Sequence, residues 1–228
     1  TICAGASLGG LMCAYSTWKI RLGPEEERNI SLRNAGAVPG IQESAGMASG
    51  ACPAFVAVSG TLWFLTALTF GAVPESLMYG IAMTLLLGLA YTDLKIMELP
   101  PELNLLIAVI GLVHLFTDIG RWHEYLIGAV LVSGLLMLIG LLSGGRAMGG
   151  GDVKLMAALG LLIGWKKILL TLMLASLAGS VLHLTLMAIL KKKRELAFGP
   201  YLAAGGMAAM LWGERIISWY LGVIMPAR

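Results

Sequence analysis

Long apolar runs restrict the fold of this chain more than any other feature. Of its 228 residues, 58% are hydrophobic and only 13% are charged, whereas a soluble domain carries roughly 25% charged residues. A transmembrane helix needs about 20 apolar residues, and open sheets cannot cross lipid. The sequence therefore predicts an all-α, polytopic membrane helix bundle of about eight spans. The expected spans are 2–18, 54–73, 76–92, 103–119, 125–143, 153–164, 168–190 and 200–224.

The basic residues between these runs predict which ends face the cytoplasm, because cytoplasmic connections are enriched in Lys and Arg. If residues 19–53 are cytoplasmic, so are the connections 93–102, 144–152 and 191–199, provided that the short run 153–164 counts as a span. This side then holds most of the basic residues, namely Lys19, Arg21, Arg28, Arg33, Lys95, Arg146 and the run Lys191–Arg194. The opposite side holds fewer.

Two aspartates stand out because of where this layout places them. Asp93 ends the third run, and Asp152 begins the sixth run after three consecutive glycines. Both are expected at the same membrane face and at the same depth. Asp152 at a helix N-terminus would also serve as a plain cap, since acids are favourable there. Asp93 near a helix C-terminus is electrostatically unfavourable, which argues against a purely structural role.

A pair of carboxylates at one depth predicts acid–base chemistry. Two such groups brought together cannot both ionise easily, so they share one proton. One then acts as the general base on a water molecule, while the other polarises the carbonyl of a peptide bond. The glycines before Asp152, Gly149 to Gly151, would let a substrate strand approach the backbone closely.

Three ordered motifs carry a resemblance to a known family. Met-Gly-Gly-Gly-Asp-Val-Lys-Leu at 148–155 contains the Gly-x-Gly-Asp signature of bacterial prepilin peptidases. Asp93 followed by Leu-Pro-Pro-Glu-Leu at 99–103 resembles a second family motif. Phe-Gly-Pro-Tyr-Leu-Ala at 198–203 is similar to the opening of the family's last span. The chain thus resembles the Gly-x-Gly-Asp membrane aspartic proteases from about residue 76 to its end.

This resemblance implies an activity, a site and a location. It implies a prepilin peptidase of the bacterial cytoplasmic (inner) membrane, whose active site faces the cytoplasm and removes short basic leaders from type IV prepilins or type II secretion pseudopilins. Asp93 and Asp152 would be catalytic. The expected substrate-binding or loop-shaping residues are Gly149, Gly150, Gly151, Lys154, Glu98 and Glu102. No metal or other cofactor is expected, and the partners are the substrates and membrane lipid, not nucleic acid.

The N-terminal part departs from the family pattern. The whole chain, 1–228, is expected to form one membrane domain, with a peptidase core at 76–228 and a cytoplasmic loop at 19–53. Many family members carry two Cys-x-x-Cys pairs in this loop, associated with methylation of the new N-terminus. Residues 19–53 contain only Cys52 and cannot build such a zinc-type site. The sequence therefore argues against methylation.

Two alternatives remain open from the sequence. A small transporter or channel could use paired acids to handle protons or cations, and it would place charged groups near the bilayer midplane. A non-enzymatic component of a secretion machine would make no catalytic use of Asp93 or Asp152. Substitution of either residue would then leave substrate processing unchanged.

Overall fold

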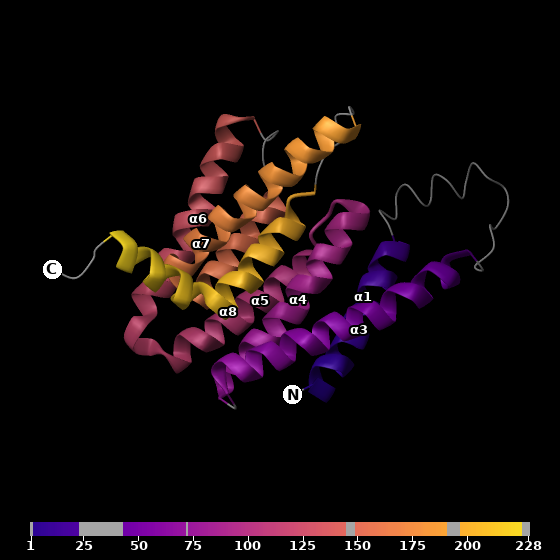
Figure 1. Ribbon diagram of the computed structural model, residues 1–228, viewed down its shortest axis with the longest axis horizontal. Coiled ribbons are helices and arrows are strands. Elements are labelled where there is room, and N and C mark those ends of the chain that lie inside the picture. Colours follow the sequence, from indigo (N-terminus) through magenta and orange to yellow (C-terminus); the bar gives the residue numbers. More distant parts are fainter. Residues whose placement is uncertain (1, 23–42, 72, 145–148, 191–196, 225–228) are drawn as a thin grey trace.

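The computed structural model describes residues 2–22, 43–71, 73–144, 149–190 and 197–224. Over these residues the chain is helical throughout. The elements are α1 (Ile2–Leu22), α3 (Glu43–Phe70), α4 (Pro74–Ile96), α5 (Pro101–Thr117), the 3₁₀ helix η1 (Ile119–Arg121), α6 (Trp122–Leu142), α7 (Gly150–Leu190) and α8 (Gly199–Ile224) (Figure 1). Four stretches of the described residues are long and apolar enough to cross a membrane: Pro53–Phe70, Pro74–Ile96, Ile119–Leu142 and Gly150–Leu182. The chain is a polytopic membrane helical protein.

Helix α7 consists of two helices joined at a sharp break. Gly164 has a φ of 77° and a ψ of 171°, a backbone conformation that side-chain-bearing residues rarely adopt. Gly206 of α8 lies against the side chains of both Leu159 and Thr171, which belong to opposite sides of the break. The chain therefore reverses near Gly164, and the segments 150–163 and 165–190 run in opposite directions. This break confirms the expected boundary between the runs 153–164 and 168–190.

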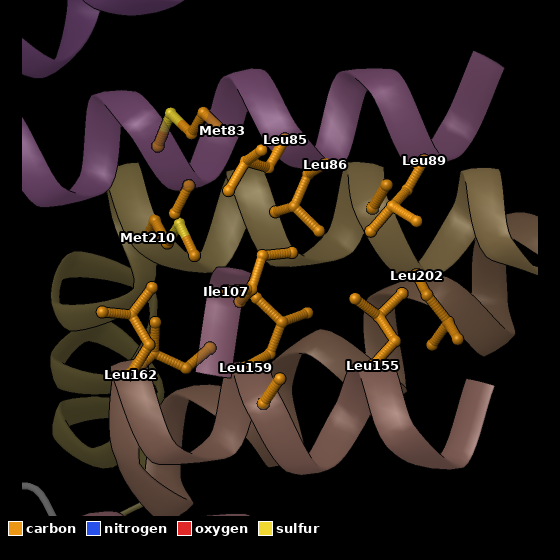
Figure 2. Close-up of a cluster of buried hydrophobic side chains, with 14 of the residues drawn as sticks. Met83, Leu85, Leu86, Leu89, Ile107, Leu155, Leu159, Leu162, Leu202 and Met210 are labelled. Carbon is orange, nitrogen blue, oxygen red and sulfur yellow. The ribbon is translucent and has the colours of Figure 1, made fainter. Parts of the chain in front are cut away.

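A compact core lies between α4, α5, α8 and the first segment of α7. In Figure 2, Leu89 of α4, Leu155 of α7 and Leu202 of α8 gather at one end of this core. Fully buried side chains of the cluster include Met83, Leu86, Leu89, Ile107, Leu155, Leu159, Leu162 and Leu202. Because lipid is as apolar as leucine, such packing stabilises the bundle mainly through close contact rather than through exclusion of water.

Helix α6 packs against α7 through glycines. A Cβ added to Gly128 would come within 2.7 Å of the carbonyl carbon of Gly164, and it would also collide with the carbonyl oxygen of Gly160. The Gly-x-x-x-Gly spacing of Gly160 and Gly164 predicts close helix packing, and this prediction is confirmed.

Helices α1 and α3 lie side by side and cover α4 (Figure 1). The indole of Trp63 is 2% exposed and lies against Gly5 of α1 and Gly80 of α4. Its Nε1 donates a 2.9 Å hydrogen bond to the hydroxyl of Thr84. Polar groups buried in lipid need such partners, so this bond ties α3 to α4.

Helices extend into both ends of the expected cytoplasmic loop at 19–53. Helix α1 extends to Leu22, and α3 begins at Glu43 rather than near residue 54. Both helices therefore enter the segment 19–53. Small residues such as those around Ala45 and Gly46 do not look apolar, yet they do not prevent a helix from continuing. The central part of the segment, 23–42, and the basic run Lys191–Arg194 lie outside the described residues.

The close contact between α6 and α7 predicts a large effect of one added methyl group. We expect Gly128→Ala to lower the free energy of unfolding by about 1–3 kcal/mol, because the new Cβ would force the two backbones apart. The matched change Gly134→Ala adds a methyl group on the same helix where nothing lies within 4 Å. Thermal unfolding in detergent should show a loss for the first variant only. Equal melting temperatures would contradict this packing.

Candidate active site

The end of α4 places Asp93 in the protein interior. The backbone carbonyl of Asp93 accepts a 2.9 Å hydrogen bond from the amide of Met97, whose φ of 53° ends the helix in the left-handed region. Two prolines, Pro100 and Pro101, follow and prevent α4 from continuing. Although Asp93 is charged at neutral pH in water, it is only 5% exposed here. A buried carboxylate of this kind requires a partner.

The partner of Asp93 is the start of α8. The amide of Gly199 donates a 2.9 Å hydrogen bond to Oδ2 of Asp93. The first amides of a helix have no partner within the helix and carry partial positive charge, so they suit a carboxylate. A Cβ on Gly199 would lie 2.5 Å from the same oxygen. This position therefore needs glycine, which explains the glycine of the Phe198-Gly199-Pro200 motif.

Asp152 lies in the first turn of the other helix that begins at this end. Its amide donates a 3.1 Å hydrogen bond to the carbonyl of Gly149, and the residue is 8% exposed. Oδ1 of Asp152 is buried and has no hydrogen-bond partner. The side chain of Leu99 lies against both Gly151, the residue before Asp152, and Gly199, whose amide bonds Asp93. The structure thus brings both aspartates to one place from segments about sixty residues apart.

The segment after α4 connects the two aspartates physically. Leu99 packs against Gly151, where an added Cβ would come within 2.9 Å of the leucine Cβ, and against Gly199, at 3.2 Å from its Cδ2. Asn104 of α5 donates a 3.4 Å hydrogen bond from Nδ2 to the carbonyl of Gly151. One apolar side chain therefore lies between the starts of α7 and α8, and the site is built from four helix ends.

The other residues expected at the site are mostly exposed. Gly151 is half-buried, whereas the remaining ones are exposed, namely Gly149, Gly150, Lys154, Glu98 and Glu102. Glu102 accepts a 3.4 Å hydrogen bond from the hydroxyl of Tyr15 on α1. Among the described residues, no three His, Cys, Asp or Glu side chains form a group that could hold a metal ion.

Sequence reasoning missed Leu99, Asn104 and Gly199 as parts of the site. Leu99 and Gly199 occur in the motifs that carry the resemblance, but nothing in the sequence indicates that both touch the aspartate region. Asn104 had one usable signal, because it is an amide inside the apolar run 103–119. A polar side chain in such a run is a candidate for function.

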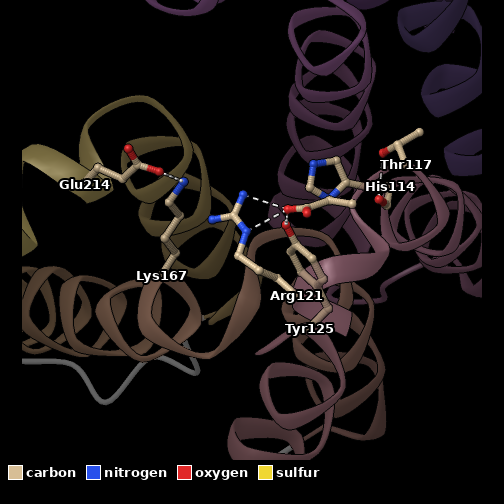
Figure 3. A network of polar contacts seen from close by, with 7 residues as sticks. His114, Thr117, Arg121, Tyr125, Lys167 and Glu214 are labelled. Atoms are coloured by element: carbon tan, nitrogen blue, oxygen red, sulfur yellow. Dashed lines mark hydrogen bonds and ion pairs between the residues drawn. The ribbon is translucent and has the colours of Figure 1, made fainter. Parts of the chain in front are cut away.

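A second polar cluster lies at the opposite ends of these helices (Figure 3). A cavity of about 400 Å³ is bordered there by the start of α4, the end of α5, the break in α7 and the second half of α8. Lys167 forms a 2.9 Å ion pair with Glu214, and Arg121 forms one of 2.6 Å with Asp118. The bundle therefore has one buried acidic end and one end of mixed charge.

Comparison with known proteins identifies the segment that holds the two aspartates. Residues 80–184 match the model of the type IV leader peptidase family. They include both Asp93 and Asp152. This segment belongs to the type IV leader peptidase family. No solved structure matches the chain.

Individual leader peptidases are similar over longer stretches. The prepilin leader peptidase/N-methyltransferase of Aeromonas salmonicida (strain A449) is 38% identical over 151 residues, which cover 61% of this chain and 50% of the relative. The protein of the same name from Legionella pneumophila is 34% identical over 68% of this chain and 57% of the relative. The Bacillus subtilis protein of that name is 29% identical over 74% of this chain and 69% of the relative. The chain spans about half the length of the first of these relatives.

The polar end of the bundle predicts a pH-dependent contribution to stability. Hydrogen bonds from Tyr125 (2.9 Å) and Arg121 (2.8 Å) hold the pKa of Asp118, between α5 and η1, below its usual value. A lowered pKa stabilises the folded state above the unfolded pKa of about 3.9, and this contribution disappears as the pH falls through the folded pKa. Asp118→Asn should therefore unfold at a lower temperature than the unchanged protein at pH 7.

The difference should become smaller as the pH falls below about 3.9 and through the lowered pKa of Asp118, where the wild-type carboxyl group also becomes protonated. Thermal unfolding in detergent at several pH values measures this difference in melting temperature. The variant Tyr125→Phe removes only the hydrogen bond from the Tyr125 hydroxyl to Asp118. A difference of the same size at every pH would contradict the role of the Asp118 charge.

Proposed function

We propose that this chain is a membrane aspartic endopeptidase that removes the leader from prepilins or pseudopilins by hydrolysis at the Asp93/Asp152 pair. The observation that carries the proposal is the convergence of two buried carboxyl groups at the ends of α4 and α7. Burial of two acids costs free energy of folding, so a pair of buried carboxyl groups points to a function. The placement of both acids in a segment of the leader peptidase family supports the same conclusion.

The surroundings of the two carboxyl groups suggest different roles for them. The Gly199 amide stabilises a charge on Asp93, so we assign Asp93 as the base that removes a proton from water. Asp152, whose buried Oδ1 has no partner, would carry the shared proton and donate a hydrogen bond to the carbonyl oxygen of the scissile bond. The water oxygen then bonds to the carbonyl carbon. Cleavage of the carbon–nitrogen bond follows as a proton passes to the leaving amine.

The substrate class follows from the family and from its relatives' names. The relatives' shared name joins a leader peptidase to an N-methyltransferase, and this chain spans about half the length of the first relatives. We propose only the peptidase activity for it. We propose no N-methyltransferase activity, because residues 19–53 contain no Cys-x-x-Cys pair. We place the exposed carboxylates Glu98 and Glu102 near the entrance, where they would attract a basic leader. Lys154 lies on the first segment of α7, two residues after Asp152.

We further propose that each of the eight long helical segments among the described residues, counting α7 as two, crosses the membrane once. The reversal at Gly164 supports this count, since it returns residue 190 to the aspartate end. The connections at that end carry Lys95, Arg146 and Lys191–Arg194, and so the positive-inside rule favours an active site at the cytoplasmic face of the inner membrane. Residues 76–228 would form the peptidase core of a single domain.

The roles of the two aspartates predict a loss of cleavage in two single variants. Asp93→Asn and Asp152→Asn should each lower the rate of leader removal by at least about 10³-fold, because an amide can neither remove nor share the proton. The assay mixes purified protein with a type IV prepilin in detergent and follows the shift of the product on a gel. A mass measurement should find the product with a free, unmethylated N-terminus.

The matched control is Asp118→Asn, which removes an aspartate from the opposite end of the bundle. It should cleave at the unchanged rate at a temperature where it is folded. Normal cleavage by both active-site variants would refute the peptidase proposal.

The contact between Gly199 and Asp93 predicts sensitivity to a single methyl group. Gly199→Ala would push the Asp93 carboxylate from its place, and a displacement of about 1 Å in a catalytic group can cost about 10²-fold in rate. Gly222→Ala, on the same helix, adds a methyl group where nothing lies within 4 Å. Rates from the same cleavage assay should fall for the first variant and remain unchanged for the second. Equal rates would remove Gly199 from the site.

A further inference from the structure

An apolar groove lies between α5, α6 and the first segment of α7. Helices α5 and α6 pack against the first segment of α7 from two sides and barely touch each other. Between them lies a groove of about 530 Å³. Its lining consists of Pro101, Asn104, Leu105 and Ala108 of α5, Ala129 of α6, and Lys154, Ala157, Ala158 and Leu161 of α7.

One end of this groove lies beside Gly151 of the candidate active site. Asn104 lies there and is bonded to the carbonyl of Gly151, the residue directly before Asp152. Lys154 of α7 lines the same end. From Lys154 to Leu161 the groove follows about 10 Å of α7, at about 1.5 Å per helical residue. This length matches about two turns of a bound helix.

The groove is lined by small side chains on all three helices. Ala108, Ala129 and Ala157 are each half-buried, and Ala158 is buried beneath them. Alanines at a helix surface allow the backbone of a neighbouring helix to approach closely in lipid. A row of alanines alone would also accept a lipid chain, so the chemistry of the groove end must distinguish the two occupants.

The amide of Asn104 makes that distinction. Asn104 is 4% exposed, and its Oδ1 has no hydrogen-bond partner, although a buried carbonyl oxygen without a donor is costly. The first amides of any helix lack acceptors within the helix. A helix that begins at this end of the groove would supply the missing donor to Asn104. A lipid acyl chain has no donor to offer.

We propose that this groove binds the first two turns of an apolar helix that begins directly after the cleavage site in the substrate. Asn104 caps the bound helix, and the scissile peptide bond, directly before it, then lies extended at Asp93 and Asp152. The inference rests on the proposed peptidase function, and it adds the surface that selects the substrate. An apolar helix joined to an extended N-terminal segment is the chemistry that this surface recognises.

Filling the groove tests the proposal. Ala157→Leu places a larger side chain on its floor, and it should raise the KM for a purified type IV prepilin about tenfold while leaving kcat nearly unchanged. The matched control is Ala178→Leu, an exposed position on the second segment of α7, away from the groove. It should leave both constants unchanged. An unchanged KM for Ala157→Leu, or a loss confined to kcat, would overturn the groove as a helix-binding site.

A cross-linking measurement keeps the proposal testable if Ala157→Leu does not fold. A photoreactive amino acid at Leu105, which is 65% exposed at the groove, should attach to the first two turns of the prepilin helix in the Asp152→Asn protein. Attachment to phospholipid alone, in vesicles that contain the prepilin, would overturn the proposal in favour of an acyl-chain groove. Attachment to the prepilin without any cleavage by the unchanged protein would refute the peptidase function and retain the groove. Cleavage of the prepilin without attachment at Leu105 would refute the groove as a helix-binding site and retain the peptidase function.

Discussion

The hydrogen bond between the Gly199 amide and the Asp93 carboxylate is the contact on which the candidate site depends. It joins the last turn of α4 to the first turn of α8, across 106 positions of sequence. The bond gives a buried charge its partner, and it uses a helix amide that would otherwise have none. Leu99 fits beside it only because Gly151 and Gly199 lack side chains. Asp152 is thereby held next to Asp93.

The reversal at Gly164 contributes to the difference between the buried acidic end of the bundle and its end of mixed charge. It turns the chain after the short segment 150–163, so that the start of α8 returns to the end of α4, beside the start of α7. The same break leaves Lys166 and Lys167 at the far end, beside the mixed-charge cavity. The first segment of α7 is covered by α5 and α6 from two sides, and the apolar groove lies between these two helices. The conformation of Gly164 thus accounts for the place of α8, whose first amide bonds Asp93.

Much of this arrangement could be predicted from the sequence because it depends on local patterns. Apolar runs predict helices, and the parity of the runs places Asp93 and Asp152 at one face. The boundary near residue 164 could also be predicted, because Lys166 and Lys167 interrupt the apolar pattern. The start of α3 at Glu43 could not, since small polar residues there give no hydrophobic signal. Leu99, Asn104 and Gly199 act through contacts between distant segments, which no single stretch of sequence displays.

The central claim is that Asp93 and Asp152 act as one catalytic unit. Its most direct test is a double-mutant cycle of cleavage rates for the unchanged protein, Asp93→Asn, Asp152→Asn and the double variant. Residues that act together lose their effect together, so the double variant should be no slower than the slower single variant. Rate losses that multiply in the double variant would mean that the two aspartates act independently, and they would contradict the shared site.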